Sequence, residues 1–204
     1  MMKIILKESQ YKKLMEDKEQ KVLHLPNIKT FGGWDGLQKF LKSKGNPLYS
    51  LSGRLRLQNE NIETLGNLVY VDGLVNLQGS KIKTLGKLKN ISGNLYLLYS
   101  NIESLGDLTN VGGIIDCIGV NKLKTLGNLE TVGESLILTG TNLESLGNLK
   151  SVGGVLSLFN TNVSSLDNLE FVGGDLDLRG TPLSKKYSET DIRDIVNVEG
   201  DIYI

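Results

Sequence analysis

The chain repeats one short phrase at an almost constant interval. Leu-Gly-x-Leu occurs five times and returns once as Leu-Asp-Asn-Leu, and the phrases begin at Leu65, Leu85, Leu105, Leu126, Leu146 and Leu166. The intervals are therefore 20, 20, 21, 20 and 20 residues. A fixed period of this length is typical of solenoids, in which each repeat forms one coil and buries its apolar side against the next coil.

Six positions of the repeat are apolar in essentially every copy. The first column is Leu55, Val75, Leu95, Ile115, Leu136, Leu156 and Leu176. The second, two residues later, is Leu57, Leu77, Leu97, Cys117, Leu138, Leu158 and Leu178. The third is Ile62, Ile82, Ile102, Leu123, Leu143, Val163 and Leu183, and equivalents of Leu65, Leu68 and Val71 complete the set. The L-x-L alternation predicts a short strand with one buried face, whereas the later period of three indicates an extended path.

These patterns predict a mainly β fold, a right-handed parallel β-solenoid over residues 51–183 with short helical caps at both ends. Glycine pairs such as Gly153-Gly154 precede the strands, where a corner needs tight backbone geometry. The position after the third column alternates in charge, which predicts a ladder of neighbours across coils. Its members are Glu63, Lys83, Glu103, Lys124 and Glu144.

The period breaks at both ends, where caps are expected. Residues 1–50 predict an N-terminal cap with helices over 7–18 and 34–44, the second ended by Gly45. Residues 184–204 predict a helix capped by Ser188, with Ile192, Ile195 and Val196 toward the last coil, and a final strand over 201–204. We expect one cooperative domain, closed at both ends and complete.

No residue pattern indicates catalysis, a cofactor or a metal. Lysine plus arginine and aspartate plus glutamate both number 23, which argues against nucleic acid as a partner. His24 is the single histidine and Cys117 the single cysteine, so zinc is excluded by ligand count, and we expect Cys117 to be a buried, inert thiol. The aspartates that could suggest calcium do not recur in each coil; they are Asp116, Asp175, Asp177 and Asp201.

Hydroxyl side chains recur at one corner, as Ser80, Ser100, Thr141, Thr161 and Thr181. Regular threonine arrays on solenoids can bind ice. These hydroxyl residues point to the same side of the chain as the third apolar column, so we expect them to face inward and to hydrogen-bond to the backbone. Ice binding is therefore the less favoured hypothesis.

The outward strand positions suggest a binding surface. The middle coils carry an apolar set there, Tyr96, Leu98, Ile118, Ile137 and Phe159, and the outer coils a polar border, Arg56, Asp177 and Arg179. A contiguous apolar patch of several hundred Å² usually marks an interaction site. Two other readings stay open: the N-terminal segment covers the patch, or the residues reflect strand propensity alone.

The segment V-G-G-V-L-S-L-F-N-T-N-V around Val152 resembles leucine-rich repeats of the receptor L-domain type. The likeness runs from Leu51 to Val172 and returns at Val198–Ile204, about three quarters of the chain. The coils are shorter than in receptor ectodomains and the disulfide-rich flanks are missing. The opening K-I-I-L-K-E-S-Q-Y-K-K-L is similar to that of uncharacterised repeat proteins of marine bacteriophages and bacteria.

The patch and the resemblance together imply a non-catalytic scaffold that binds a protein through its exposed strand face. The alternative is a phage virion or assembly component, which would self-associate more often. We expect no membrane partner and no signal peptide, because the N-terminus has only a three-residue apolar run, Ile4–Leu6. Without a signal peptide, we expect the protein in the host cytoplasm, or in a virion if a phage encodes the chain.

Overall fold

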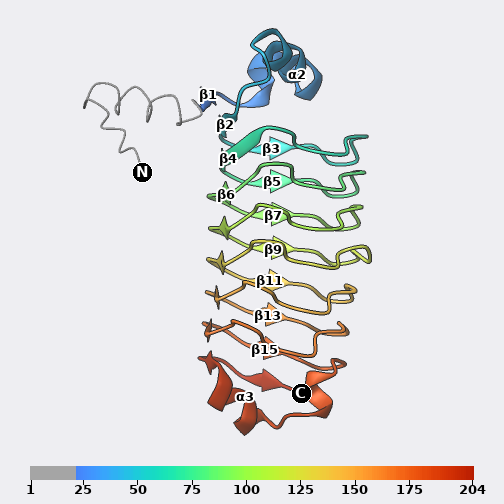
Figure 1. The fold of residues 1–204 in the computed structure, drawn as a ribbon, viewed down its shortest axis with the longest axis vertical. Helices are drawn as coiled ribbons and strands as arrows, with labels where there is room; N and C mark the ends of the chain where they lie inside the picture. Colours follow the sequence, from blue (N-terminus) through green and yellow to red (C-terminus); the bar gives the residue numbers. More distant parts are fainter. Residues whose placement is uncertain (1–21) are drawn as a thin grey trace, which may run out of the picture.

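A computed structural model of the protein describes residues 22–204. Over this range the chain is a mainly β solenoid whose coils stack along one long axis (Figure 1). The stack is regular because equivalent strand residues pair in register from coil to coil, as Leu55 with Val75 and Val75 with Leu95. The helix predicted over 7–18 lies outside the described residues.

The L-x-L segments form an eight-stranded parallel sheet, as the alternation predicts. Each strand pairs with those of the coils before and after it, in the order β17-β15-β13-β11-β9-β7-β5-β3. The strands are β3 (Leu55–Arg56), β5 (Val75–Asn76), β7 (Leu95–Tyr96), β9 (Ile115–Asp116), β11 (Leu136–Ile137), β13 (Leu156–Ser157), β15 (Leu176–Asp177) and β17 (Ile202–Tyr203).

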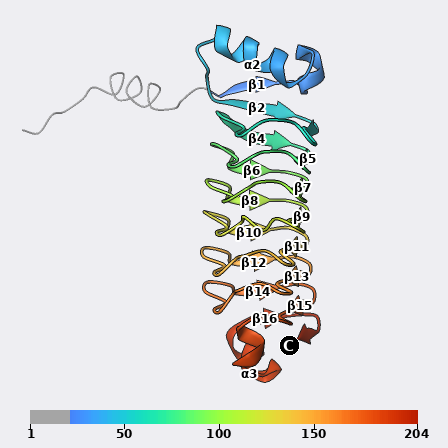
Figure 2. The ribbon, with the colours of Figure 1, turned by 90° about the vertical axis from the view of Figure 1, so that its right-hand side faces the viewer.

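Val71 and its equivalents in the other coils lie on strands of a second parallel sheet, which has nine strands (Figure 2). The sequence predicted only an extended path for this part of each coil. Most of its strands carry one buried apolar residue, three positions after the preceding one, so no alternation marks this sheet in the sequence. Its strands are β1 (Leu23–Leu25), β2 (Tyr49–Ser52), β4 (Leu68–Asp72), β6 (Asn90–Ile91), β8 (Asn110–Val111), β10 (Thr131–Val132), β12 (Ser151–Val152), β14 (Phe171–Val172) and β16 (Asn197–Val198).

Isolated parallel bridges link a third side of the coils, joining Thr64 to Thr84, Thr84 to Ser104 and Ser104 to Thr125. The predicted charge ladder runs beside them. Within residues 22–204 only its first step is an ion pair, with Lys83 Nζ 3.0 Å from Glu63 Oε1. Both side chains are solvent-exposed, so the pair contributes at most about 1 kcal/mol.

The inward columns fill the centre of the stack. All members of the first two columns are buried, Cys117 included, and in the third only Ile62 stays half-buried. The hydroxyl ladder faces inward, as predicted, since all five side chains are buried. Ser80, Thr161 and Thr181 each donate to the backbone carbonyl three residues earlier. The hydroxyls of Ser100 and Thr141 have no hydrogen-bond partner among residues 22–204, so the predicted backbone bond is wrong for these two.

The sequence suggested that tight corner geometry requires the glycine pairs before the strands. The structure gives a different cause, which Gly153 illustrates. A Cβ built on Gly153 would lie 2.1 Å from the carbonyl oxygen of Gly133 in the preceding coil, although the φ of Gly153 is not positive. Close approach of two coil backbones therefore requires this glycine, rather than a left-handed conformation.

The N-terminal end carries η1 (Ile28–Phe31) and α2 (Trp34–Ser43), and α2 ends one residue before its predicted limit. Gly45 follows at φ 80°, the left-handed geometry expected of a helix stop. The same segment also supplies β1, which pairs with β2 as an extra strand that helical periodicity did not predict.

The C-terminal end carries η2 (Leu183–Lys185) and α3 (Glu189–Ile195). Ser188 and Asp191 form a reciprocal capping box, so the predicted N-cap is confirmed. Ile192 and Val196 are buried, but Ile195 is 54% exposed, and its predicted inward position is wrong. Ile195 is the last residue of α3, and the chain becomes extended at Val196, which takes the buried position after Ile192.

Candidate interaction surface on the eight-stranded sheet

The strand face is the outer side of the eight-stranded sheet, and it presents three columns of side chains. Pairing of the strands fixes the middle column as Arg56, Asn76, Tyr96, Asp116, Ile137, Ser157, Asp177 and Tyr203. The column two residues later is Gln58, Gln78, Leu98, Ile118, Thr139, Phe159 and Arg179. The column two residues earlier, which the sequence analysis did not consider, is Arg54, Leu74, Asn94, Ile114, Ser135, Val155, Asp175 and Asp201.

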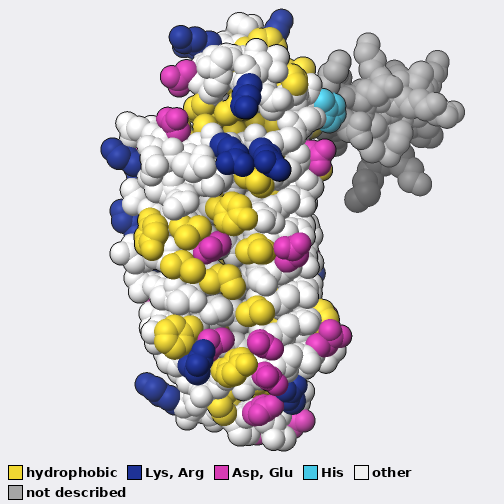
Figure 3. Space-filling view, turned by 180° about the vertical axis from the view of Figure 1, so that it is seen from behind, with side chains coloured by type: hydrophobic (Ala, Val, Ile, Leu, Met, Phe, Trp, Pro, Cys, Tyr) yellow, Lys and Arg dark blue, Asp and Glu magenta, His cyan; other side chains and the backbone are white. Residues whose placement is uncertain are grey.

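Apolar side chains gather across the middle of this face, with acidic groups among them, and basic side chains lie toward the N-terminal end (Figure 3). Asp116 of the middle column lies in this central region, and Asp175, Asp177 and Asp201 lie at the C-terminal end. The predicted members Tyr96, Leu98, Ile137 and Phe159 are half-buried, and Ile118 is 37% exposed. The earlier column adds Leu74, Ile114 and Val155, all half-buried. The predicted apolar residues therefore do lie on one face.

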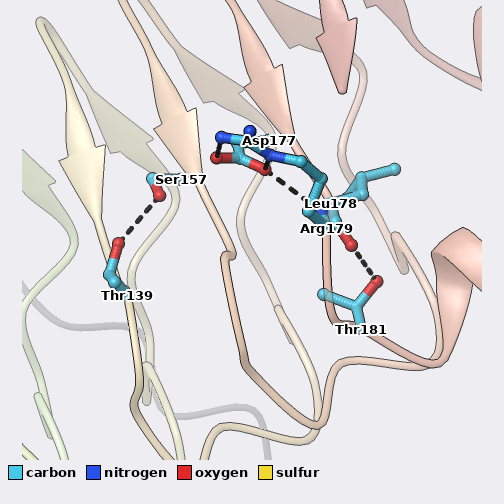
Figure 4. Close-up of polar contacts among 6 residues, drawn as sticks. All are labelled: Thr139, Ser157, Asp177, Leu178, Arg179 and Thr181. Atoms are coloured by element: carbon cyan, nitrogen blue, oxygen red, sulfur yellow. Dashed lines mark hydrogen bonds and ion pairs between the residues drawn. The ribbon is translucent and has the colours of Figure 1, made fainter. Parts of the chain in front are cut away.

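Hydrogen bonds between neighbouring side chains hold the polar members of the face in place. The Asn94 amide donates to the Tyr96 hydroxyl at 2.7 Å, and the amide oxygen of Asn94 accepts from the Ile114 backbone N–H at 3.1 Å. The hydroxyls of Thr139 and Ser157 lie 2.9 Å apart (Figure 4). A face whose polar groups are already oriented loses less side-chain entropy when it binds.

Asp177 and Arg179, both predicted as border residues of the face, bind each other (Figure 4). Arg179 Nη2 lies 2.7 Å from Asp177 Oδ2, and Nε donates to Oδ1 at 3.0 Å. This hydrogen bonding lowers the pKa of the Asp177 carboxyl. The Arg179 guanidinium also lies 5.5 Å from the Phe159 ring centre and 5.2 Å from that of Tyr203, so it links three successive strands.

Arg56 and Arg54 take part in no ion pair among residues 22–204, and both are exposed. Beside them a pocket of about 580 Å³ is lined by Asn27, Ile28, Lys29, Gly53, Arg54 and Arg56. The N-terminal end of the strand face therefore carries positive charge that no acidic side chain of the described chain neutralises.

Tyr99, which the sequence analysis did not select, follows the strand face around its corner. It is 66% exposed, the highest value among the exposed large apolar residues of the described chain. Its ring lies against the next coil, because a Cβ built on Gly119 would be 2.5 Å from two of its ring atoms.

The backbone of Tyr99 is left-handed, at φ 55°. Every equivalent residue of the other coils is also left-handed, and each of these is glycine or asparagine: Asn59, Gly79, Gly119, Gly140, Asn160 and Gly180. A bulky residue in this conformation costs roughly 1–3 kcal/mol, and such strain tends to occur at functional sites. The break in this glycine and asparagine column was visible in the sequence as the one aromatic among its seven members.

His24 and Cys117 are the two residues whose side chains could have suggested catalysis or metal binding, and both make contacts within the fold. His24 lies on β1, with Nδ1 2.7 Å from the Ser50 hydroxyl of β2. Cys117 is fully buried, and this burial strongly raises the pKa of its thiol. Within residues 22–204 no three histidine, cysteine, aspartate or glutamate side chains are grouped closely enough to hold a metal ion. Nor does this part of the chain contain a helix with the length and apolar character to cross a membrane.

Comparison with known proteins gives no relative: no family model matches the chain, and no curated protein or solved structure is significantly similar to it.

Proposed function

We propose that the protein is a non-catalytic scaffold that binds another protein through the strand face. The observation that carries this proposal is Tyr99, an exposed aromatic held in a strained backbone conformation where the other coils use glycine or asparagine. The Tyr99 ring contacts the next coil at Gly119, but the left-handed backbone at this position disfavours tyrosine. A binding role gives a reason to keep it, since tyrosine is enriched at the residues that dominate interface energetics.

The surroundings of Tyr99 support the same function. Half-buried apolar side chains continue from it over several coils, and Tyr96 and Phe159 provide two further aromatic rings. Charged side chains occupy both ends of the face, and an apolar centre with a polar rim is the usual anatomy of a protein interface.

We also propose that the coils are related to leucine-rich repeats of the receptor L-domain type. The inward columns and the continuous parallel sheet formed by the L-x-L strands support this relationship. The alternative function, a component of a phage particle, would use the same face between copies of the chain.

Site-specific photo-cross-linking tests the binding function. The photoreactive amino acid p-benzoylphenylalanine replaces Ile118 in the centre of the face, or Asn90 on the outer side of the nine-stranded sheet as a matched exposed control. After irradiation in an extract of the source organism, we expect a discrete cross-linked protein from position 118 and none from position 90. An excess of unmodified protein should compete with it.

Equal labelling from both positions, or no product from position 118, would contradict a binding role for the strand face. The mass of the product also distinguishes a second copy of this chain from a different protein.

A further inference from the structure

The strand face has opposite charge at its two ends. Arg54 and Arg56 lie on and beside β3, the first strand of the eight-stranded sheet. At the other end Asp175, Asp177 and Asp201 lie around β15 and β17, and Arg179 neutralises only Asp177. The first end therefore carries a charge of about +2 and the last about −2, with mainly apolar side chains and Asp116 between them.

Two copies of one face can meet through a two-fold axis in two ways. If the axis runs along the stack, each strand faces itself, so Arg56 meets Arg56 and Asp177 meets Asp177 of the second copy. If the axis runs along the strands, the order of the coils reverses, and β3 of one copy faces β17 of the other. Like charges repel in the first arrangement, whereas the second places each basic end on an acidic end.

We propose that the partner of the strand face is a second copy of the chain, packed face to face with its coils in reverse order. This inference rests on the proposed binding function and names its partner. In this arrangement the register of the sheet places Arg54 opposite Asp201 of the second copy, and symmetry repeats the pair at the other end.

Side-chain size fits this arrangement at three facing positions, while Leu98 faces Phe159 and Asp116 faces Ile137 of the second copy. β7 faces β13 of the second copy, which places Tyr96 opposite Ser157. β9 faces β11 of the second copy, which places Ile114 opposite Ser135 and Ile118 opposite Thr139. Large side chains opposite small ones let two surfaces interdigitate, as in a packed core.

The size of the face suits a reversible dimer. Seven inter-strand spacings make it roughly 34 Å long, and three outward side chains per strand make it roughly 20 Å wide. Full contact would bury on the order of 700 Å² on each copy, slightly less than the ~800 Å² per partner of a standard interface. An area just below the standard size is typical of reversible association.

Charge reversal tests the arrangement. Sedimentation equilibrium should show a monomer–dimer equilibrium for the unmodified protein. Arg54→Glu or Asp201→Lys alone should each weaken dimerisation at least about tenfold, because every substitution acts twice in a two-fold dimer. The double variant carrying both changes should recover most of the affinity. Lys87→Glu, at an exposed position on another side of the coil, is the matched control and should change little.

Cysteine cross-linking gives an independent result. Mixing Tyr96→Cys with Ser157→Cys protein should yield a mixed dimer with a short bis-maleimide, and native Cys117 should not react because it is buried. Ser157→Cys alone should give little product. Efficient cross-linking of Ser157→Cys alone would overturn the reversed arrangement, because only the other two-fold brings Ser157 against itself.

Failure to recover dimerisation in the double charge variant would also overturn the inference. So would a protein that stays monomeric up to submillimolar concentration while position 118 cross-links to a different protein. That last result would leave the proposed binding function standing.

Discussion

Single residues that break the repeat are the most informative positions of this protein. In the corner column after the strands, glycine and asparagine satisfy a left-handed backbone, and only Tyr99 departs from them. In the Leu-Gly-x-Leu column, glycine is left-handed in five coils, and only Asp167 departs, at φ 50°. Both departures were visible in the sequence, but only contacts show what each replacement does.

Asp167 contributes a structural bond between coils. Its Oδ2 accepts hydrogen bonds from the Ser145 hydroxyl at 2.7 Å, and from the backbone N–H groups of Leu146 at 2.7 Å and Gly147 at 3.0 Å. Partial burial alone would raise the pKa of this carboxyl, but its hydrogen bonds outweigh that effect and hold the pKa below its ordinary value.

Asp167 therefore makes the free energy of unfolding depend on pH. A carboxyl with a depressed pKa in the folded state stabilises the protein above its unfolded pKa, and the contribution is lost as pH falls through the folded pKa. We expect Asp167→Asn, which still tolerates the left-handed backbone, to lower the free energy of unfolding by about 1 kcal/mol at neutral pH. The deficit should shrink as pH falls below about 4.

Urea unfolding of both proteins across this pH range checks the expectation, with Asp107→Asn as control because Asp107 is an exposed carboxylate in the same phrase of an earlier coil. A deficit that stays constant with pH would mean that the ionised carboxylate is not the stabilising form.

At the scale of elements, the coil is defined by close backbone contact as much as by apolar columns. Gly153 and Gly140 separate two roles of glycine: a Cβ on Gly153 would clash with the preceding coil, whereas a Cβ on Gly140 meets nothing within 4 Å but would sit at φ 70°. We expect Gly153→Ala to destabilise the fold by about 2–3 kcal/mol, since two coils must move apart. Gly140→Ala should cost only about 1 kcal/mol.

Chemical denaturation measures both, and Gly140→Asn serves as a control because Asn59 and Asn160 occupy the same column. If Gly140→Ala proved the more damaging substitution, left-handed strain rather than coil spacing would limit this fold.

How far sequence predicts each element depends on how many residues carry its pattern. The L-x-L strands and α2 repeat their signal over many residues, and the structure confirms them. Most strands of the nine-stranded sheet carry a single buried apolar residue and therefore show no alternation. The face composition was predictable from alternation, but the Asp177–Arg179 pair was not, because side-chain rotamers decide whether two charges meet each other or a partner.

At the scale of the whole molecule, the inward and outward columns have separable tasks. The inward columns are buried almost completely and are sufficient reason for the stack to form. The strand face has an apolar centre, opposite charges at its ends and a strained tyrosine at its margin, none of which the stack requires. If the strand face is kept for binding, some substitutions on it should raise the stability of the protein and lower its affinity for the partner.

Tyr99→Asn tests that separation most directly, because the change removes the exposed ring and supplies a residue that other coils use in the same conformation. Urea unfolding and the yield of cross-linking from position 118 are measured on the same preparation. We predict a free energy of unfolding that rises by about 0.5–1 kcal/mol, together with a cross-linking yield that falls severalfold. A less stable variant that cross-links as well as the unmodified protein would contradict a binding role for the strand face.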